Sequence, residues 1–425
     1  MKHFSLMIFL GATLGGAMAI AQDRIAPPAP YGPVPSERQL RWHEVEFYRF
    51  LHFTMNTFTD KEWGYGDESP ALFSPSDFDA NEIARLAKEV GMKGLILTAK
   101  HHDGFCLWPS QYTGHSVKNS AWKAGEGDVV KEIAEACRRY ELKFGVYLSP
   151  WDRHHRDYGK PEYIIYYRNQ LQELLTNSGE TCWATYSPVG EDGGEPAPGD
   201  TRYREGVAGH HDGKFWPPAE CDVSIRPGWF YHAREDSSVK SPAHLFDLYF
   251  QSVGRNASLL LNIPPDRRGR VHEKDVSALQ EFKRLLDQTF VRDFAAGATV
   301  TASNVRGKDL RFSANNLMDS DKATYWATDD AVTTALLAFT LREKSTFNSL
   351  MLQEHIALGQ RVEAFAVEYW NGSAWTQVAS GTTIGHKRLL CFPDVTTDKV
   401  RLIIHRAKAC PAIARFALFK TPANH

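Results

Sequence analysis

In the first part of the chain, short apolar runs alternate with segments in which apolar residues recur at helical spacing. Short, almost wholly apolar runs occur at 48–53, 95–98 and 144–148, as expected of strands that are buried on both faces of a parallel sheet. Between them, apolar residues recur at helical spacing over 79–90 and 128–140. This order of strand, helix, strand, helix, strand predicts an α/β fold with a parallel sheet covered by helices.

The alternation is interrupted after a third helix, which we expect over about 162–175. No buried strand follows it, and 187–218 is a predicted loop that holds 12 Gly or Pro among its 32 residues. The pattern then predicts a strand over 222–225, a helix from 241 to about 253, a strand over 258–263 and a helix over 275–290. The total is five or six strands, whereas a closed (β/α)₈ barrel needs eight. We therefore expect a barrel-type domain that is incomplete.

From about Gly297, apolar residues occur at every second position, as in Val400, Leu402 and Ile404. This alternation is typical of β-strands. The pair Asn371-Gly372 lies between two strand-like runs and predicts a hairpin turn. We predict a barrel domain over 22–296 followed by an all-β sandwich over 297–425.

Composition narrows the possible functions. The chain has 425 residues, of which 43% are hydrophobic and 24% charged, and its 49 basic and 51 acidic side chains give a net charge of −2. These values are typical of a folded soluble protein. A protein that binds nucleic acid through a basic surface is not expected.

The N-terminus has the pattern of an export signal. Lys2 precedes an apolar run over 4–14, and Ala19-Ile20-Ala21 has the form of a signal-peptidase site. We predict a signal peptide over 1–21 and a periplasmic or secreted protein. No later run reaches 18 consecutive apolar residues, so no membrane span is expected.

Polar and aromatic residues cluster just after the predicted strands, at the edge where (β/α) barrels place their active sites. The clusters lie at 50–56, 62–64, 100–105 and 147–152. Their His, Trp and carboxylate side chains suit a pocket that binds sugar hydroxyls and packs a sugar face on an aromatic ring. The histidine spacing does not favour a metal site. If they continue a strand, the adjacent His101 and His102 should point to opposite faces.

Four segments carry a family resemblance: 97–108, 145–152, 219–230 and 254–265. They resemble the α-L-fucosidases of glycoside hydrolase family 29, and the likeness runs from about Trp42 to Phe290. The resemblance implies a (β/α)₈ barrel that removes terminal fucose from fucosylated glycans by a retaining mechanism, without a cofactor. The Glu62-Trp63 stretch and the appended sandwich look closest to the branch that acts on α-1,3/1,4-linked fucose.

The resemblance also assigns binding residues. Residues matching fucose contacts are His52, His101, His102 and Trp229, and the further expected members are Glu62, Trp63 and Tyr147. For Glu220 the resemblance favours a binding or supporting role over catalysis.

The family's catalytic motifs are missing from this sequence. Its nucleophile is an Asp in a Trp-Phe-Asp-Gly strand, and the acid/base of the related branch is a Glu in a Gly-Asn-Glu motif; neither motif occurs here. We expect an internal loss between Asn177 and Ser178 that removes two strand and helix units with both carboxylates. The catalytic residues are therefore unassigned. Two hypotheses follow. The chain is a member of the fucosidase family with little or no activity, or it is a non-catalytic protein that binds fucose or other glycans.

The segment 316–326 resembles the early motif of discoidin-type (F5/8 type C) modules, which bind carbohydrate. The alternative is a purely structural sandwich without a ligand. The oligomeric state is not predicted by the sequence.

Overall fold

The computed structural model describes residues 25–178, 213 and 215–422. The predicted signal peptide and most of the loop predicted over 187–218 lie outside these residues. No helix in the described part of the chain is long and apolar enough to cross a membrane.

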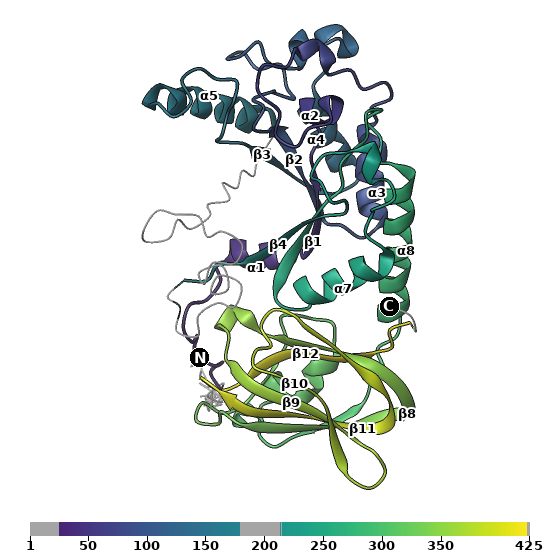
Figure 1. Ribbon diagram of the computed structural model, residues 1–425. Helices are drawn as coiled ribbons and strands as arrows, with labels where there is room; N and C mark the ends of the chain where they lie inside the picture. The colour runs from purple at the N-terminus through teal and green to yellow at the C-terminus, as the bar shows by residue number, and fades with distance from the viewer. Residues whose placement is uncertain (1–24, 179–212, 214, 423–425) are drawn as a thin grey trace, which may run out of the picture.

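Among the described residues, the first domain is built on five parallel strands. They are β1 (Phe47–Leu51), β2 (Gly94–Lys100), β3 (Lys143–Leu148), β4 (Ala219–Ser224) and β5 (Ala257–Asn262). Their order is β3-β2-β1-β5-β4, so β3 and β4 are edges in the described sheet, and Figure 1 shows them fanned apart. The expected α/β fold and the shortage of strands are confirmed. In the described residues the sheet is open, three strands short of the eight in a closed barrel.

Seven α-helices of the described residues belong to this domain. They are α1 (Glu37–His43), α2 (Met55–Thr59), α3 (Ala80–Glu89), α4 (Val129–Arg139), α5 (Pro161–Ser178), α7 (Pro242–Ser252) and α8 (Glu273–Phe290). Their starts follow local capping chemistry: Asp79 accepts hydrogen bonds from Asn81 N and Glu82 N at the start of α3, and Asp128 does the same for Lys131 N in α4. Asn177 and Ser178, between which we expect an internal loss, are the last two described residues of α5.

Each face of the sheet has its own packing. On the outer face, α3, α4, α7 and α8 pack against the strands around residues such as Leu97, Ile133 and Phe282 (Figure 1). The inner face carries a much smaller apolar cluster around Tyr48, Phe50 and Leu260. Because β4 is an edge strand, its inward residues Glu220 and Asp222 are exposed.

The second domain is an antiparallel β-sandwich, as the sequence predicts. Its strands are β6 (Thr299–Ala302), β7 (Trp326–Ala327), β8 (Ala335–Glu354), β9 (Val362–Trp370), β10 (Trp375–Gly381), β11 (Arg388–Ala407) and β12 (Ala412–Phe419). The long strands β8 and β11 pair along most of their length, with register shifts in between. The beginning of β8 pairs with β6, and its end pairs with β12. The Asn371-Gly372 turn joins β9 and β10, which confirms the predicted hairpin.

A partly buried ion pair links the two domains. Glu46, just before β1, lies 2.5 Å from Lys387 Nζ and 3.0 Å from His386 Nε2. Burial by itself raises the pKa of Glu46, but Lys387 and His386 outweigh it and lower the pKa to about 2. The carboxylate is therefore charged at neutral pH and holds the sandwich against the base of the parallel sheet.

Candidate functional site

A cavity of about 210 Å³ lies at the carboxyl ends of the central strands. It is lined by Phe50, His52, Glu62, Trp63, His101, His102, Tyr147, Asp222 and Trp229. Seven of the eight predicted site residues meet here, and only Glu220 does not. The side chains come from loops and strand ends far apart in sequence, brought together because the strands are parallel.

One amide orients two sides of the cavity. Asn262, the last residue of β5, has its Oδ1 2.9 Å from His52 Nδ1, and its Nδ2 donates to the Trp229 carbonyl at 2.8 Å. Asn262 Nδ2 also donates to Ser224 Oγ at 2.9 Å. The sequence did not single out Asn262, because both of its site partners are remote along the chain.

His101 and His102 face the same cavity, so the expectation that they point to opposite faces is wrong. Strand β2 ends at Lys100, and the two histidines lie in the turn that follows, where the alternation of a strand no longer applies. Their ring centroids are 4.0 Å apart. His102 Nδ1 lies 2.7 Å from Ser149 Oγ, which fixes its ring against the end of β3.

The histidines of the cavity are neutral at physiological pH. Burial lowers the pKa of His52 to about 3 and lowers the pKa of His101 well below its ordinary value. The pKa of His102 is also lowered, first by burial and then by Arg153. A neutral imidazole offers one donor and one acceptor, which suits hydrogen bonding to hydroxyl groups. In the described residues, no three His, Cys, Asp or Glu side chains are grouped to hold a metal ion.

Glu62 holds the backbone turn that forms one wall of the cavity. Its carboxylate accepts hydrogen bonds from Trp229 N at 3.0 Å and from Phe230 N at 3.1 Å, and lies 2.8 Å from His232 Nε2. A Cβ atom at Gly228 would approach Glu62 Oε1 to 2.6 Å, so the turn needs glycine there. Glu62 thus fixes the backbone that carries Trp229.

Aromatic rings form the rest of the wall. The Phe50 ring lies 5.9 Å from Tyr147 and 6.5 Å from Trp229, between centroids. Trp63 is 57% exposed and stands at the rim, with its ring 5.8 Å from Trp151. These rings provide the flat apolar faces on which sugar rings pack.

The two carboxylates of β4 have different positions. Asp222 lines the cavity, whereas Glu220, two residues earlier, accepts a hydrogen bond from the Tyr48 hydroxyl outside it. Although Asp222 is in contact with solvent, desolvation by the surrounding groups, followed by the charge of Glu220, raises its pKa to about 7. The pKa of Glu220 is also raised, by burial. Of these two carboxylates, only Asp222 is part of the cavity wall.

A buried ion pair supports the loops after β2 and β3. Lys100 Nζ, with a fully buried side chain, lies 2.9 Å from Asp152 Oδ2 and donates to Gln170 Oε1 at 2.9 Å. Its third partner is the Tyr163 hydroxyl at 3.2 Å. Because Gln170 and Tyr163 belong to α5, this cluster fastens both loops to that helix.

Comparison with known families agrees with this site. A family model described as "Alpha-L-fucosidase" matches residues 32–188 and 199–289, which include every cavity residue. The chain belongs to the α-L-fucosidase family. A second family model, "NedA-like, galactose-binding domain", matches residues 316–402 of the sandwich.

Relatives with the same architecture span nearly the whole chain. Alpha-L-fucosidase 1 of Arabidopsis thaliana is 37% identical, over 92% of this fucosidase-family chain and 88% of its own. The solved structure named SpGH29 is 34% identical, with a TM-score of 0.85 and coverage of 93% of this chain and 100% of its own. A Ruminococcus gnavus GH29 fucosidase in complex with fucose is 30% identical, with a TM-score of 0.83 and coverage of 94% and 97%.

Proposed function

We propose that the cavity binds a terminal α-L-fucose of α-1,3/1,4-branched glycans, and that this chain hydrolyses the fucoside slowly or not at all. The observation that carries the proposal is the meeting of His52, His101, His102 and Trp229 in one cavity of a fucosidase-family chain that lacks both catalytic motifs.

The chemistry of the wall supports fucose binding. His52 Nδ1 donates to Asn262 Oδ1, so the neutral His52 ring offers Nε2 as an acceptor to a sugar hydroxyl. His101 Nδ1 faces the Asn56 amide nitrogen, so the neutral His101 ring offers Nε2 as a donor. Phe50 and Trp229 offer apolar faces to the ring and methyl group of the sugar. The cavity volume of about 210 Å³ suits one sugar ring rather than a longer glycan.

The loss of catalysis is supported by what surrounds the cavity. A retaining glycosidase needs two carboxyl groups about 5 to 5.5 Å apart, one as nucleophile and one as acid/base. Among the described residues, Glu62 already accepts from two backbone nitrogens, and Glu220 is bound by Tyr48 outside the cavity. Asp222 is left as a single carboxylate without a free partner in the described cavity wall.

The length of the alignment with a relative also supports a loss of residues from this chain. The alignment with the Arabidopsis relative extends over 454 positions, more than the 425 residues of this chain, so that relative has residues with no counterpart here. Among the described residues the parallel sheet has five strands, three fewer than a closed barrel, which supports a loss of strand and helix units.

Isothermal titration of the full chain with L-fucose tests the binding half of the proposal. We expect saturable binding of L-fucose and at least about tenfold weaker binding of D-fucose, whose hydroxyls and methyl group are mirror images. Equal affinity for the two enantiomers, or no binding to a well-folded chain, would contradict it.

We further propose that the protein is exported, on the basis of the Ala19-Ile20-Ala21 site. N-terminal mass analysis of protein from the periplasm or culture medium should show Gln22 as the first residue. Retention of Met1 in mature protein would contradict export.

A further inference from the structure

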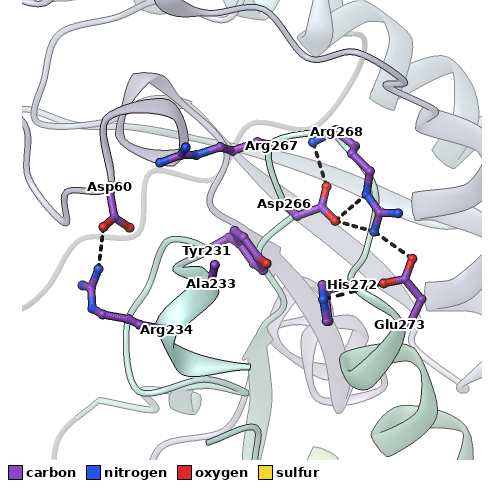
Figure 2. Close-up of a pocket in the computed structure, with 9 residues that line it drawn as sticks. All are labelled: Asp60, Tyr231, Ala233, Arg234, Asp266, Arg267, Arg268, His272 and Glu273. Atoms are coloured by element: carbon purple, nitrogen blue, oxygen red, sulfur yellow. Dashed lines mark hydrogen bonds and ion pairs between the residues drawn. The ribbon is translucent and has the colours of Figure 1, made fainter. Parts of the chain in front are cut away.

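A second and larger cavity lies beside the cavity that contains His52 and Trp229, which we call the fucose pocket after its proposed ligand. Its volume is about 490 Å³, within the range of about 300 to 1,000 Å³ that small-molecule sites occupy. Its lining comes from the loops after β1, β4 and β5 and from the start of α8, and Figure 2 shows these side chains. None of its lining residues belongs to the fucose pocket.

One buried imidazole separates the two cavities. His232 Nδ1 lies 2.5 Å from Asp60 Oδ1, on the side of the larger cavity, and His232 Nε2 lies 2.8 Å from Glu62 Oε1, on the side of the fucose pocket. The two sites are therefore neighbours, divided by a single ring with a carboxylate at each end.

The acidic groups of the larger cavity already have partners. Asp60 Oδ2 pairs with Arg234 at 2.7 Å. Asp266 pairs with Arg268 at 2.6 Å, and Glu273 pairs with the same guanidinium at 2.8 Å. Figure 2 shows these two groups of ion pairs on opposite sides of the Tyr231 ring.

Arg267 differs from the other two arginines. Its Nε donates to the Thr57 carbonyl at 3.2 Å, and no carboxylate among the described residues forms an ion pair with its guanidinium. The side chain is exposed and contributes positive potential at Asp60. Arg267 lines the cavity, and a guanidinium can bind carboxylate and sulfate oxygens through two parallel N–H groups.

The cavity also offers a flat face. The Tyr231 ring is backed by the guanidinium of Arg226, 4.7 Å from its centroid, and Arg226 is in turn fixed by Asp275 at 2.9 Å. The His272 ring lies 5.7 Å from the Tyr231 ring between centroids. Tyr231 is therefore held in place, and the part of its ring that lines the cavity can contact a sugar.

We propose that this cavity binds an acidic sugar, with the carboxylate or sulfate group on Arg267 and the sugar ring beside Tyr231. The site is separate from the fucose pocket, and the inference does not depend on fucose binding.

Matched ligand pairs test the proposal on the full chain by isothermal titration. N-acetylneuraminic acid is compared with its methyl ester, and glucose 6-sulfate with glucose, so that each pair differs only in the anionic group. We expect each acid to bind about tenfold or more tightly than its neutral partner. In Arg267→Gln the difference should disappear, and in Arg267→Lys part of it should remain.

The control variant is Arg284→Gln on α8, whose arginine is exposed and pairs with Glu281 instead of lining the cavity. It should bind both acids as the parent chain does. Thermal melts establish that each variant is folded. Unchanged acid binding in folded Arg267→Gln would overturn the site, and inorganic sulfate binding as tightly as glucose 6-sulfate would overturn the role of the sugar ring.

Discussion

The carboxylate of Glu62 accepts a hydrogen bond from the backbone nitrogen of Trp229 at 3.0 Å, across 167 positions of the chain. The same carboxylate holds the backbone of Phe230 and the ring of His232. Glu62 therefore fixes one wall of the fucose pocket through the main chain, in addition to lining it.

Glu62→Gln is expected to weaken fucose binding. The amide has one acceptor oxygen and no charge, so at least one charge-assisted hydrogen bond to the 228–230 turn is lost, worth about 1.5 to 3 kcal/mol. The dissociation constant for L-fucose should rise about 10- to 100-fold in a calorimetric titration. Glu343→Gln, at an exposed pair with Arg292, is the control and should bind as the parent does. Unaltered affinity in Glu62→Gln would show that the turn is fixed by other contacts.

Lys100→Met is expected to destabilise the first domain strongly. It leaves Asp152 buried without its cation, which costs about 3 to 5 kcal/mol in the free energy of unfolding. Lys160→Met removes an exposed pair with Asp157 and should change stability by less than about 1 kcal/mol. Urea unfolding of both variants gives the comparison. Similar losses of unfolding free energy in the two variants would mean that the buried pair contributes no more to stability than the exposed pair.

Asp103 predicts a particular dependence of stability on pH. Burial raises its pKa to about 7, and hydrogen bonds from Phe105 N and Thr54 oppose this only in part. Since the folded pKa lies above the ordinary value of about 3.9, its contribution to stability is complete below about pH 4 and is lost as the pH rises to about 7.

Asp103→Asn removes this titration. Between pH 5 and pH 8, the parent chain should lose about 2 to 3 kcal/mol of unfolding free energy relative to the variant. Denaturant melts at both pH values measure the difference. A constant gap between parent and variant across this range would mean that Asp103 does not titrate there.

The fragment 297–425 is expected to fold alone. Its core around Trp326, Leu337 and Phe416 is separate from the core of the first domain. The fragment lacks residue Ala29, whose carbonyl accepts from Arg361 Nη2 at 2.6 Å in the full chain, and should therefore melt at a lower temperature than the sandwich does there. Calorimetry should show one cooperative transition, and glycan arrays test whether it binds galactosides. A non-cooperative melt would place the domain boundary elsewhere.

The periodic parts of the fold were predictable from local sequence. The apolar runs around Leu97 and Val146 form strands, and Asp79 and Asp128 start helices, because each signal lies within the element it specifies. The hairpin at Asn371-Gly372 follows from two residues.

The site was predictable only in part. Family motifs led to the residues that line the cavity, but Asn262 and His232 act through partners 210 and 170 positions away, which no local pattern reveals. The direction of His101 and His102 depends on where β2 ends, and the position of Glu220 depends on its contact with Tyr48, so neither could be predicted from local sequence.

The most direct test of the account is turnover of an aryl α-L-fucoside by the purified chain, compared with a version in which the segment that we propose to be lost is inserted between Asn177 and Ser178. The loss of nucleophile and acid/base predicts a rate lower by about 10⁴-fold or more for the chain as it stands, with fucose still bound, and recovery in the restored version. Equal turnover by the two chains at a rate typical of fucosidases would contradict the account and would direct attention to Asp222 as a catalytic carboxylate.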